Sequence, residues 1–444
     1  MKCSWLFFTS VLLAAAAEVP GPAEPAVTLA EAVRIAVEKH PDVDKARAGA
    51  EILKGKIREV RAQALPDVSI NGSAMRMRDP SLLNASGLDQ WPAEFRDALV
   101  PVGANLFDYR ITVKQPLYTA GKVGTALKLA GVEAEGALAE IDRAEQDISL
   151  AVVKAFYGLL WAERYERQVA ETQEQKKRHA EMAETRYRNG VATEVDVLRS
   201  QVQVSNGEPD LVRARAATRQ ARALLNYYLS RPLDQPTRIA GDFETRPWED
   251  WDLESLSYEA FRRRPELTRL RIAERSAAVQ LDLARAENRF RADFQADYGI
   301  MSRLTSNLAS PKFARWDFTA TFTLPVFDGF KRSGLVYQAT AAQRQARLER
   351  TKTEQQVRLA LQQGLDELTA AHQTVEAARA NVAQAEKVLT MMQNNYKYGA
   401  ATTLDIVDAQ TALSVARTNL LRGLHDDSVA RANLRWMMGE KPWE

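Results

Sequence analysis

The side chains that most often carry chemistry in proteins are few and scattered in this sequence. Its four histidines lack the spacing of metal ligands: His40, His179, His372 and His425. No nucleophile constellation and no glycine-rich phosphate-binding loop occurs. The sequence therefore nominates no catalytic residue, no cofactor and no metal site, and it predicts that the protein is not an enzyme.

One motif that contains aspartate occurs twice. Residues 186–201 have the sequence RYRNGVATEVDVLRSQ, and residues 395–410 have NYKYGAATTLDIVDAQ. Five residues recur 209 positions later, as the pairs Tyr187 and Tyr396, Gly190 and Gly399, Thr193 and Thr402, Asp196 and Asp405, and Gln201 and Gln410. Both copies lie between long polar, alanine-rich runs, with a glycine where a helix could reverse. The motif therefore predicts two helix–turn–helix tips, and its repetition predicts two similar halves of the chain.

The composition favours long helices. The chain has 444 residues, of which 45% are hydrophobic and 27% are charged, with a net charge of +2 and only 21 glycines and 17 prolines. This balance suits a folded protein and gives no reason to expect a nucleic-acid partner. No run of about 20 apolar residues follows the N-terminus, so a helical transmembrane protein is excluded.

Residues 1–17 have the features of a secretory signal peptide: one basic residue, a short apolar core and a small-residue end before Glu18. A buried N-terminal helix is the weaker interpretation, because prolines follow at positions 20, 22 and 25. Removal of this segment would also remove Cys3, the only cysteine. We therefore expect an exported mature chain with no thiol, and the sequence gives no sign of a lipid anchor.

Four segments alternate apolar and polar residues with the period of two that is typical of strands. They are residues 67–78 and 106–118 in the first half and 293–304 and 316–327 in the second. Pro41 and Pro116 are 75 residues apart, whereas their counterparts Pro265 and Pro325 are 60 apart. We assign the 15-residue difference to a longer loop in the first hairpin.

Each pair of strands precedes a long helical hairpin with coiled-coil periodicity, at residues 121–229 and 330–438. The long helix of each would have about 68 residues and reach roughly 100 Å, too long for a compact domain. Pro209 should break or bend the first return helix. The predicted organisation is a first repeat at 18–256, ending in an equatorial connector at 231–256, and a second repeat at 257–444.

The strands match those of outer-membrane β-barrels in length and in their aromatic faces. Four strands cannot close a barrel, so other copies of the chain must complete it. A dimer would supply 8 strands, and a trimer 12 with a lumen wide enough to conduct. The helices, too polar for lipid, would continue the strands into the periplasm as a helical tube.

At this point the sequence resembles the TolC-type outer-membrane efflux and secretion channels over essentially the whole mature chain. The resemblance rests on Leu29-Ala-Glu-Ala32, His40-Pro41, the strand ends Gln115-Pro-Leu-Tyr118 and Leu324-Pro-Val-Phe327, and the two tip motifs. It implies an α+β membrane protein, a homotrimer with a 12-stranded outer-membrane β-barrel and a periplasmic α-helical barrel. It also implies that the channel docks onto a periplasmic adaptor (membrane fusion) protein and an inner-membrane pump or ABC exporter.

The resemblance also implies a gate at the helix tips. The family's paired gate aspartates fall on Asp405 and Asp408, which three copies would arrange as six carboxylates around one axis. Its tyrosine–aspartate pair between coils falls on Tyr396 and Asp196. The expected adaptor-docking residues are Gly190, Val191, Gly399 and Ala400. Ala401 stands where the family archetype has an arginine, so the lock should be absent or built differently, and Arg199 replaces the second aspartate in the first tip.

The predicted function is an outer-membrane exit duct of a tripartite efflux or type I secretion system, passive and gated at its periplasmic end. For single features, the alternative for the aromatic stripes is the core of a soluble sandwich, and the alternative for Asp405 and Asp408 is ordinary solvated helix residues. For the whole chain, the alternative is a soluble periplasmic coiled-coil structural or assembly protein. That alternative leaves the four alternating strands unexplained. The sequence does not identify the cargo: drugs, metal ions, polypeptides and metabolites all stay open.

Overall fold

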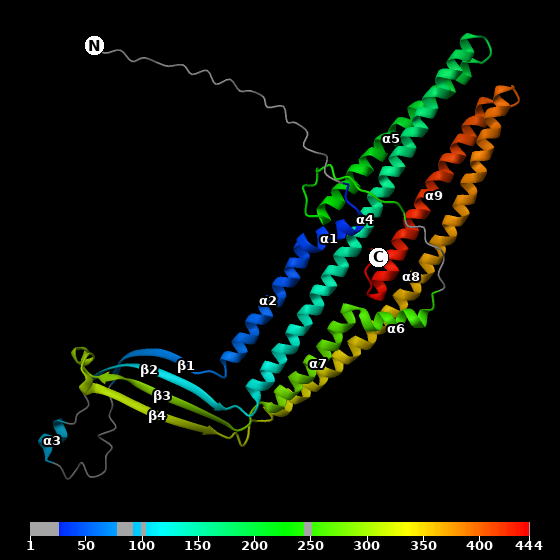
Figure 1. Ribbon diagram of the computed structural model, residues 1–444. Coiled ribbons are helices and arrows are strands. Elements are labelled where there is room, and N and C mark those ends of the chain that lie inside the picture. The colour runs from blue at the N-terminus through cyan, green and yellow to red at the C-terminus, as the bar shows by residue number, and fades with distance from the viewer. Residues whose placement is uncertain (1–25, 78–91, 99–103, 244–250, 444) are drawn as a thin grey trace, which may run out of the picture.

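The computed structural model describes residues 26–77, 92–98, 104–243 and 251–443. The predicted signal peptide at 1–17 lies outside them. The molecule is elongated, with a β-sheet at one end and two helical tips at the other (Figure 1). Among the described residues, no helix is both long enough and apolar enough to cross a membrane.

Two helices of 67 residues each run most of the length of the molecule: α4 (Lys122–Arg188) and α8 (Lys331–Lys397). At 1.5 Å per residue each spans about 100 Å. Each reverses into a return helix, α5 (Glu194–Tyr228) or α9 (Thr403–Met438). Both long helices start and end 209 positions apart, so the repeat seen in the motif extends through the whole hairpin.

Of the break or bend expected in the first return helix, the break does not occur, because α5 is continuous through Pro209. A close contact with α4 accompanies the proline. Gly207 leaves room for the side chain of Gln173, which is almost fully buried. The Gln173 Nε2 donates to the carbonyl of Val204 at 2.8 Å, in the turn that the proline disturbs. The carbonyl that loses its ladder donor to the proline is that of Ser205, so Gln173 bonds to the adjacent carbonyl of the same turn.

Shorter helices flank the lower halves of the long ones. In the first half these are α1 (Leu29–Lys39) and α2 (Pro41–Ala62), and in the second α6 (Leu253–Arg263) and α7 (Pro265–Ala286). In each pair the first helix ends and the second begins at an X–Pro step, where the residue before the proline has an extended backbone. The predicted connector at 231–256 is too long, because α6 already begins at Leu253. Asp252 caps this helix by accepting a hydrogen bond from the Ser255 N–H.

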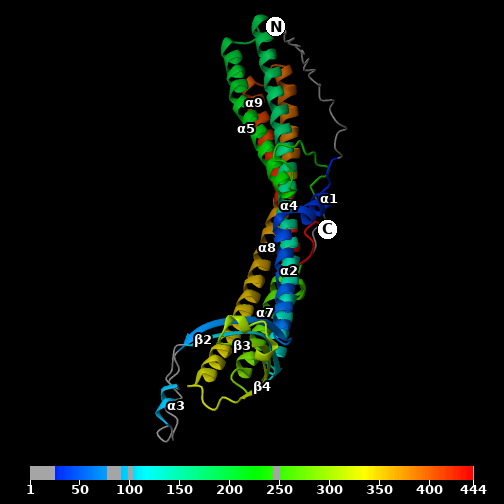
Figure 2. The same cartoon turned by 90° about the vertical axis from the view of Figure 1, so that its left-hand side faces the viewer.

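The sheet has four antiparallel strands in the order β1-β2-β3-β4: β1 (Asp67–Met77), β2 (Ala104–Tyr118), β3 (Arg291–Ser302) and β4 (Ala314–Thr323). β2 and β3 come from different repeats and pair in the middle, so β1 and β4 are the edges. A short helix, α3 (Ala93–Ala98), lies between β1 and β2. Figure 2 shows that strands and helices together form a thin layer.

The last strand is shorter than the predicted 316–327. It ends at Thr323, and Pro325, which has no N–H to donate, follows. The chain then turns through Gly329 and Phe330, both with positive φ, before α8 begins. The segment between β1 and β2 has 15 residues more than that between β3 and β4, in agreement with the predicted longer loop.

The two faces of the sheet are opposite in character and burial. One row across all four strands is Ile70, Ile111, Tyr298 and Trp316, and Trp316 is 68% exposed. The adjacent row on the other face contains Thr112 and Asp297, and Asp297 is only 4% exposed. The Thr112 hydroxyl and the Gln295 amide both donate to the Asp297 carboxylate. At its centre the polar face is therefore buried and satisfied by hydrogen bonds, whereas the aromatic face is bare.

Two apolar cores hold the helices together near mid-length. In the first, Phe156 and Leu159 of α4 pack with Leu225 of α5 and Val33 of α1. In the second, Leu361 and Leu368 of α8 pack with Leu267, at the start of α7, and Leu434 of α9. Each return helix is thus anchored where it meets a short helix, and the hairpins extend from there to their tips.

We predict that Gly207→Ala destabilises the first hairpin by about 1–3 kcal/mol, the usual cost of overpacking. An added Cβ would lie 1.9 Å from the Gln173 Oε1, so Gln173 must move and lose its bond to Val204. Thermal unfolding followed by circular dichroism in detergent measures the effect. Gly158→Ala in α4 is the matched control: it meets nothing within 4 Å and should be neutral or slightly stabilising. An equal response of both variants would contradict the packing argument.

Candidate gate at the helical tips

Both tips are built by the same backbone design. Gly190 and Gly399 have φ of 74° and 78°, the left-handed region that favours glycine. In the first tip the N–H of Val191 donates to the Arg186 carbonyl at 3.0 Å. In the second, the N–H of Ala400 donates to the Asn395 carbonyl at 2.8 Å. These bonds are those of a Schellman motif and end α4 and α8 at the glycine.

A capping box then starts each return helix. The N–H of Thr402 donates to the Asp405 Oδ2 at 2.7 Å, and the N–H of Asp405 donates to the Thr402 hydroxyl at 3.3 Å. Thr193 and Asp196 make the same pair of bonds at 3.0 and 3.3 Å. Two of the predicted gate residues, Asp405 and Asp196, therefore also have a structural role in the turn.

The capping bonds affect the acidity of both carboxyls. Hydrogen bonds from the backbone and then the side chain of Thr402 lower the pKa of Asp405. For Asp196 the side-chain bond to Thr193 is the larger cause of its lowered pKa, followed by the backbone bond. Each donor stabilises the ionised form, so both groups carry a fixed negative charge at neutral pH.

Asp408 lies one turn beyond Asp405 and is exposed on the same helix. Within the described part of the chain, its carboxylate has no hydrogen bond or ion pair. The structure thus places Asp405 and Asp408 together at the start of α9, near the end of the molecule. The corresponding position on α5 is Arg199, so within one chain only the second tip carries two carboxylates.

Tyr396 joins the two hairpins, but not through Asp196. The guanidinium of Arg186, on α4, lies over the Tyr396 ring at 4.3 Å from its centroid. The ring of His179, also on α4, lies 6.3 Å from it. The Tyr396 hydroxyl is 3.5 Å from the Thr403 Oγ1, and no contact with Asp196 occurs between these described residues. The predicted pairing of Tyr396 with Asp196 is therefore not formed in the single chain.

Sequence reasoning missed Arg186 and His179, although the repeat contains a signal for both. Their counterparts 209 positions later are Asn395 and Val388, so both positions differ between otherwise similar halves. The four predicted docking residues, Gly190, Val191, Gly399 and Ala400, are exposed at the end of the molecule. Their position is compatible with docking, which stays a prediction.

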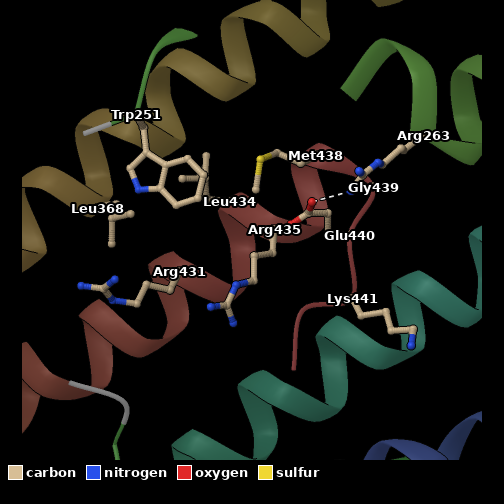
Figure 3. A pocket seen from close by; sticks show the side chains of 10 residues that line it. All are labelled: Trp251, Arg263, Leu368, Arg431, Leu434, Arg435, Met438, Gly439, Glu440 and Lys441. Carbon is tan, nitrogen blue, oxygen red and sulfur yellow. Dashed lines mark hydrogen bonds and ion pairs between the residues drawn. The ribbon is translucent and has the colours of Figure 1, made fainter. Parts of the chain in front are cut away.

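A cavity with several basic side chains lies elsewhere, near the C-terminus, with a volume of about 540 Å³ (Figure 3). Two of its basic side chains form ion pairs within the chain: Arg263 pairs with Glu440, and Arg431 pairs with Asp427 at 2.8 Å. Leu434 and Trp251 line its apolar side. This cavity belongs to the junction of α6, α8 and α9 and has no direct contact with the tips.

The four-stranded sheet has its apolar face exposed and its polar face partly buried, the inverse of a soluble protein. Together with helical hairpins of about 100 Å, this defines a class, the outer-membrane proteins that extend through the periplasm. The chain belongs to the outer membrane efflux protein family, whose model matches residues 32–230 and 256–440. The resemblance and the outer-membrane location predicted from the sequence are thereby confirmed.

Known proteins agree with this assignment. Protein CyaE of Bordetella pertussis is 24% identical over 326 residues, which are 72% of this chain and 65% of CyaE, slightly less than two thirds of that relative's length. A membrane protein from Pseudomonas aeruginosa has a TM-score of 0.78 at 19% identity, covering 93% of this chain and 90% of that one. The CmeC outer membrane channel of Campylobacter jejuni has a TM-score of 0.77 at 13% identity, with coverage of 93% and 85%. These likenesses confirm the predicted fold class.

We predict that Asp405→Asn weakens the cap and speeds hydrogen exchange of the first-turn amides of α9. Because the pKa of Asp405 is lowered, the stabilisation by its carboxylate is full above the ordinary pKa of about 3.9 and is lost only as the pH falls through the lowered value. Exchange mass spectrometry at pH 7 measures the effect. Asp408→Asn, on the same helix but outside the capping box, should leave those amides unchanged. Similar exchange in both variants would show that the cap does not hold the tip.

Proposed function

We propose that this protein is the outer-membrane exit duct of a tripartite efflux or type I secretion system, and that three copies form it. The free edges of the sheet carry the argument. β1 and β4 have one hydrogen-bonded neighbour each, and unpaired backbone groups are not tolerated in lipid. Because the strands are antiparallel throughout, β4 of one copy can pair with β1 of the next. Three copies give the closed 12-stranded barrel.

The inverted faces of the sheet support the orientation of that barrel. The exposed apolar side chains, among them Ile70, Tyr298, Trp316 and Phe318, would face lipid. The hydrogen-bonded polar side chains, among them Thr112 and Asp297, would face a wet lumen. A soluble periplasmic protein would leave the aromatic stripe in water, at a cost of about 25 cal/mol for each Å².

The order of the helices supports a tube below the barrel. α2 packs on α4, α4 on α7, and α7 on α8, so one chain supplies a layer of four neighbouring helices. Towards the tips the layer continues as the pairs α4/α5 and α8/α9, with α4 also against α9. Repeating the layer around an axis would enclose a passage. This arrangement leaves six tips for docking by a periplasmic adaptor and an inner-membrane pump.

The duct would be passive, and its periplasmic mouth would be the controlled element. In a trimer, Asp405 and Asp408 would form a ring of six carboxylates with opposing effects. They would attract cations and repel each other when the mouth is closed. Docking of an adaptor and pump would open the mouth. The chemistry of the wall does not select a cargo.

We expect a charge on the aromatic face of β4 to block assembly, because a lysine at the middle of the bilayer costs about 2–4 kcal/mol. Phe318→Lys places the charge on that face, and Thr319→Lys places it on the opposite one. Membrane fractionation and detection of trimers measure the outcome. Only Phe318→Lys should reduce recovery in the outer membrane. Recovery of the unchanged protein in the soluble periplasm would refute the channel proposal.

Asp408→Asn should weaken block of the single-channel current by a trivalent cation added on the periplasmic side. Loss of three of the six charges should raise the half-blocking concentration several-fold, because each charge contributes to the cation's binding energy. Planar bilayers measure it. Asp426→Asn, further along α9, is the matched control. Block that is unchanged in Asp408→Asn would remove this residue from the mouth.

A further inference from the structure

The two hairpins of one chain are joined near their tips by an aromatic contact that the capping motifs do not explain. Arg186 is on the last turn of α4, and Tyr396 is on the last turn of α8. The guanidinium lies over the ring at 4.3 Å, within the range of a cation–π interaction. Both side chains are partly covered, which limits competition by water. The contact crosses the boundary along which the hairpins would have to separate.

A buried histidine lies behind this contact. His179 is 9% exposed, and its ring is tilted against the Tyr396 ring at 6.3 Å. Among the described residues, its Nε2 has no hydrogen-bond partner. Two cavities of about 210 and 320 Å³ share His179 in their walls. Space therefore exists beside a polar atom that is buried without a partner.

The charged groups around His179 are mainly positive. On its own helix, Lys176 and Arg178 line the two cavities, and on α8 Lys397 does so. The only carboxylate in either wall is Asp210 of α5. The side chains that α9 contributes are uncharged: Ile406, Val407, Gln410, Thr411, Ser414 and Val415. A proton on His179 would therefore enter a buried site with an excess of cations.

From this arrangement we propose that Arg186, Tyr396 and His179 form an acid-released latch that holds the two hairpins of each chain together and keeps the mouth closed. The idea rests on the proposed function, since it assigns the residues that control that duct. Arg186 supplies the cation that Ala401 does not. Protonation of His179 opposes closure because the imidazolium can gain water and escape the neighbouring cations only when the hairpins part.

The direction of the pH effect follows from burial. Burial lowers the pKa of His179 in the closed form. Opening would expose the ring and return its pKa to about 6.5. The closed form is therefore favoured fully above about pH 6.5, and it loses that advantage as the pH falls below this value. Acid should open the mouth, and alkali should not.

The latch would act within each chain and not between chains. The counterparts of Arg186 and His179 in the second repeat are Asn395 and Val388, which provide neither a cation nor an imidazole. Tyr187, the counterpart of Tyr396, is 43% exposed in the single chain. A contact between α8 of one copy and α4 of the next thus cannot repeat the same chemistry. Each trimer would contain three latches.

Single-channel recording of the full-length trimer in planar bilayers at pH 8.0 and 5.5 tests the proposal. The wild type should open several-fold more often at pH 5.5. His179→Gln, neutral at both values, should lose most of this acid response. Arg186→Gln should raise opening at pH 8.0, and Arg186→Lys, which keeps a cation, should restore closure. Arg188→Gln on the exposed side of the same turn should behave as the wild type.

The outcomes separate the latch from the duct. Channels that form normally, with the same acid response in His179→Gln and unchanged opening in Arg186→Gln, would overturn the latch and leave the exit duct standing. A purified outer-membrane trimer that passes no current at either pH would overturn the exit duct itself. Circular dichroism of each variant confirms that the hairpins are folded before recording.

Discussion

The requirement that every backbone hydrogen-bonding group in lipid find a partner governs this molecule. A four-stranded sheet with two open edges is not stable there, so the chain can function only as part of a larger closed assembly. The same requirement explains the inverted faces. An aromatic face is bare in the single chain because its solvent is not water, and Asp297 is covered because three neighbours on the polar face, Thr112, Gln295 and Arg110, surround it. In this sheet, the pattern of burial therefore indicates which face is turned to lipid and which to the lumen, and it does not mark a hydrophobic core.

The internal repeat gives the two hairpins the same length, and the positions at which the two halves differ give their tips different side chains. Two long helices of equal length allow three chains to approximate a ring of six similar hairpins. A strictly sixfold mouth would have no preferred place to separate. Among the positions at which the two halves differ near the tips are Arg186 against Asn395, His179 against Val388, and Arg199 against Asp408. The first two put a cation or a titratable group in the first half only, and the third puts opposite charges in the two halves. In the proposed trimer, contacts within a chain and contacts between chains would thus be chemically distinct, so one kind could separate before the other.

The sequence predicted the elements well where one local signal dominated. Alternation located the strands, and the prolines at 41 and 265 located the helix junctions within a residue. Local rules failed where a distant side chain intervened. Pro209 does not break α5, and Gln173, more than 30 positions earlier, bonds to the carbonyl of Val204 in the same turn. The tips show the same limit. Their turns follow from Gly190 and Gly399, whereas the stacking of Arg186 on Tyr396 joins residues 210 apart and depends on how two hairpins pack.

The structural and functional interpretations of Asp405 are compatible with each other. The capping box uses one oxygen, Oδ2, as the acceptor from Thr402, and leaves Oδ1 available to a cation. The bonds that hold the carboxylate also lower its pKa, so it stays ionised when a second carboxylate, Asp408, is one turn away. Like charges held close together would otherwise favour protonation of one of them. In the proposed trimer, a ring of negative charge at the mouth would therefore be stabilised by the same turn that reverses the chain, and Asp405, in the first turn of α9, would repel its copies.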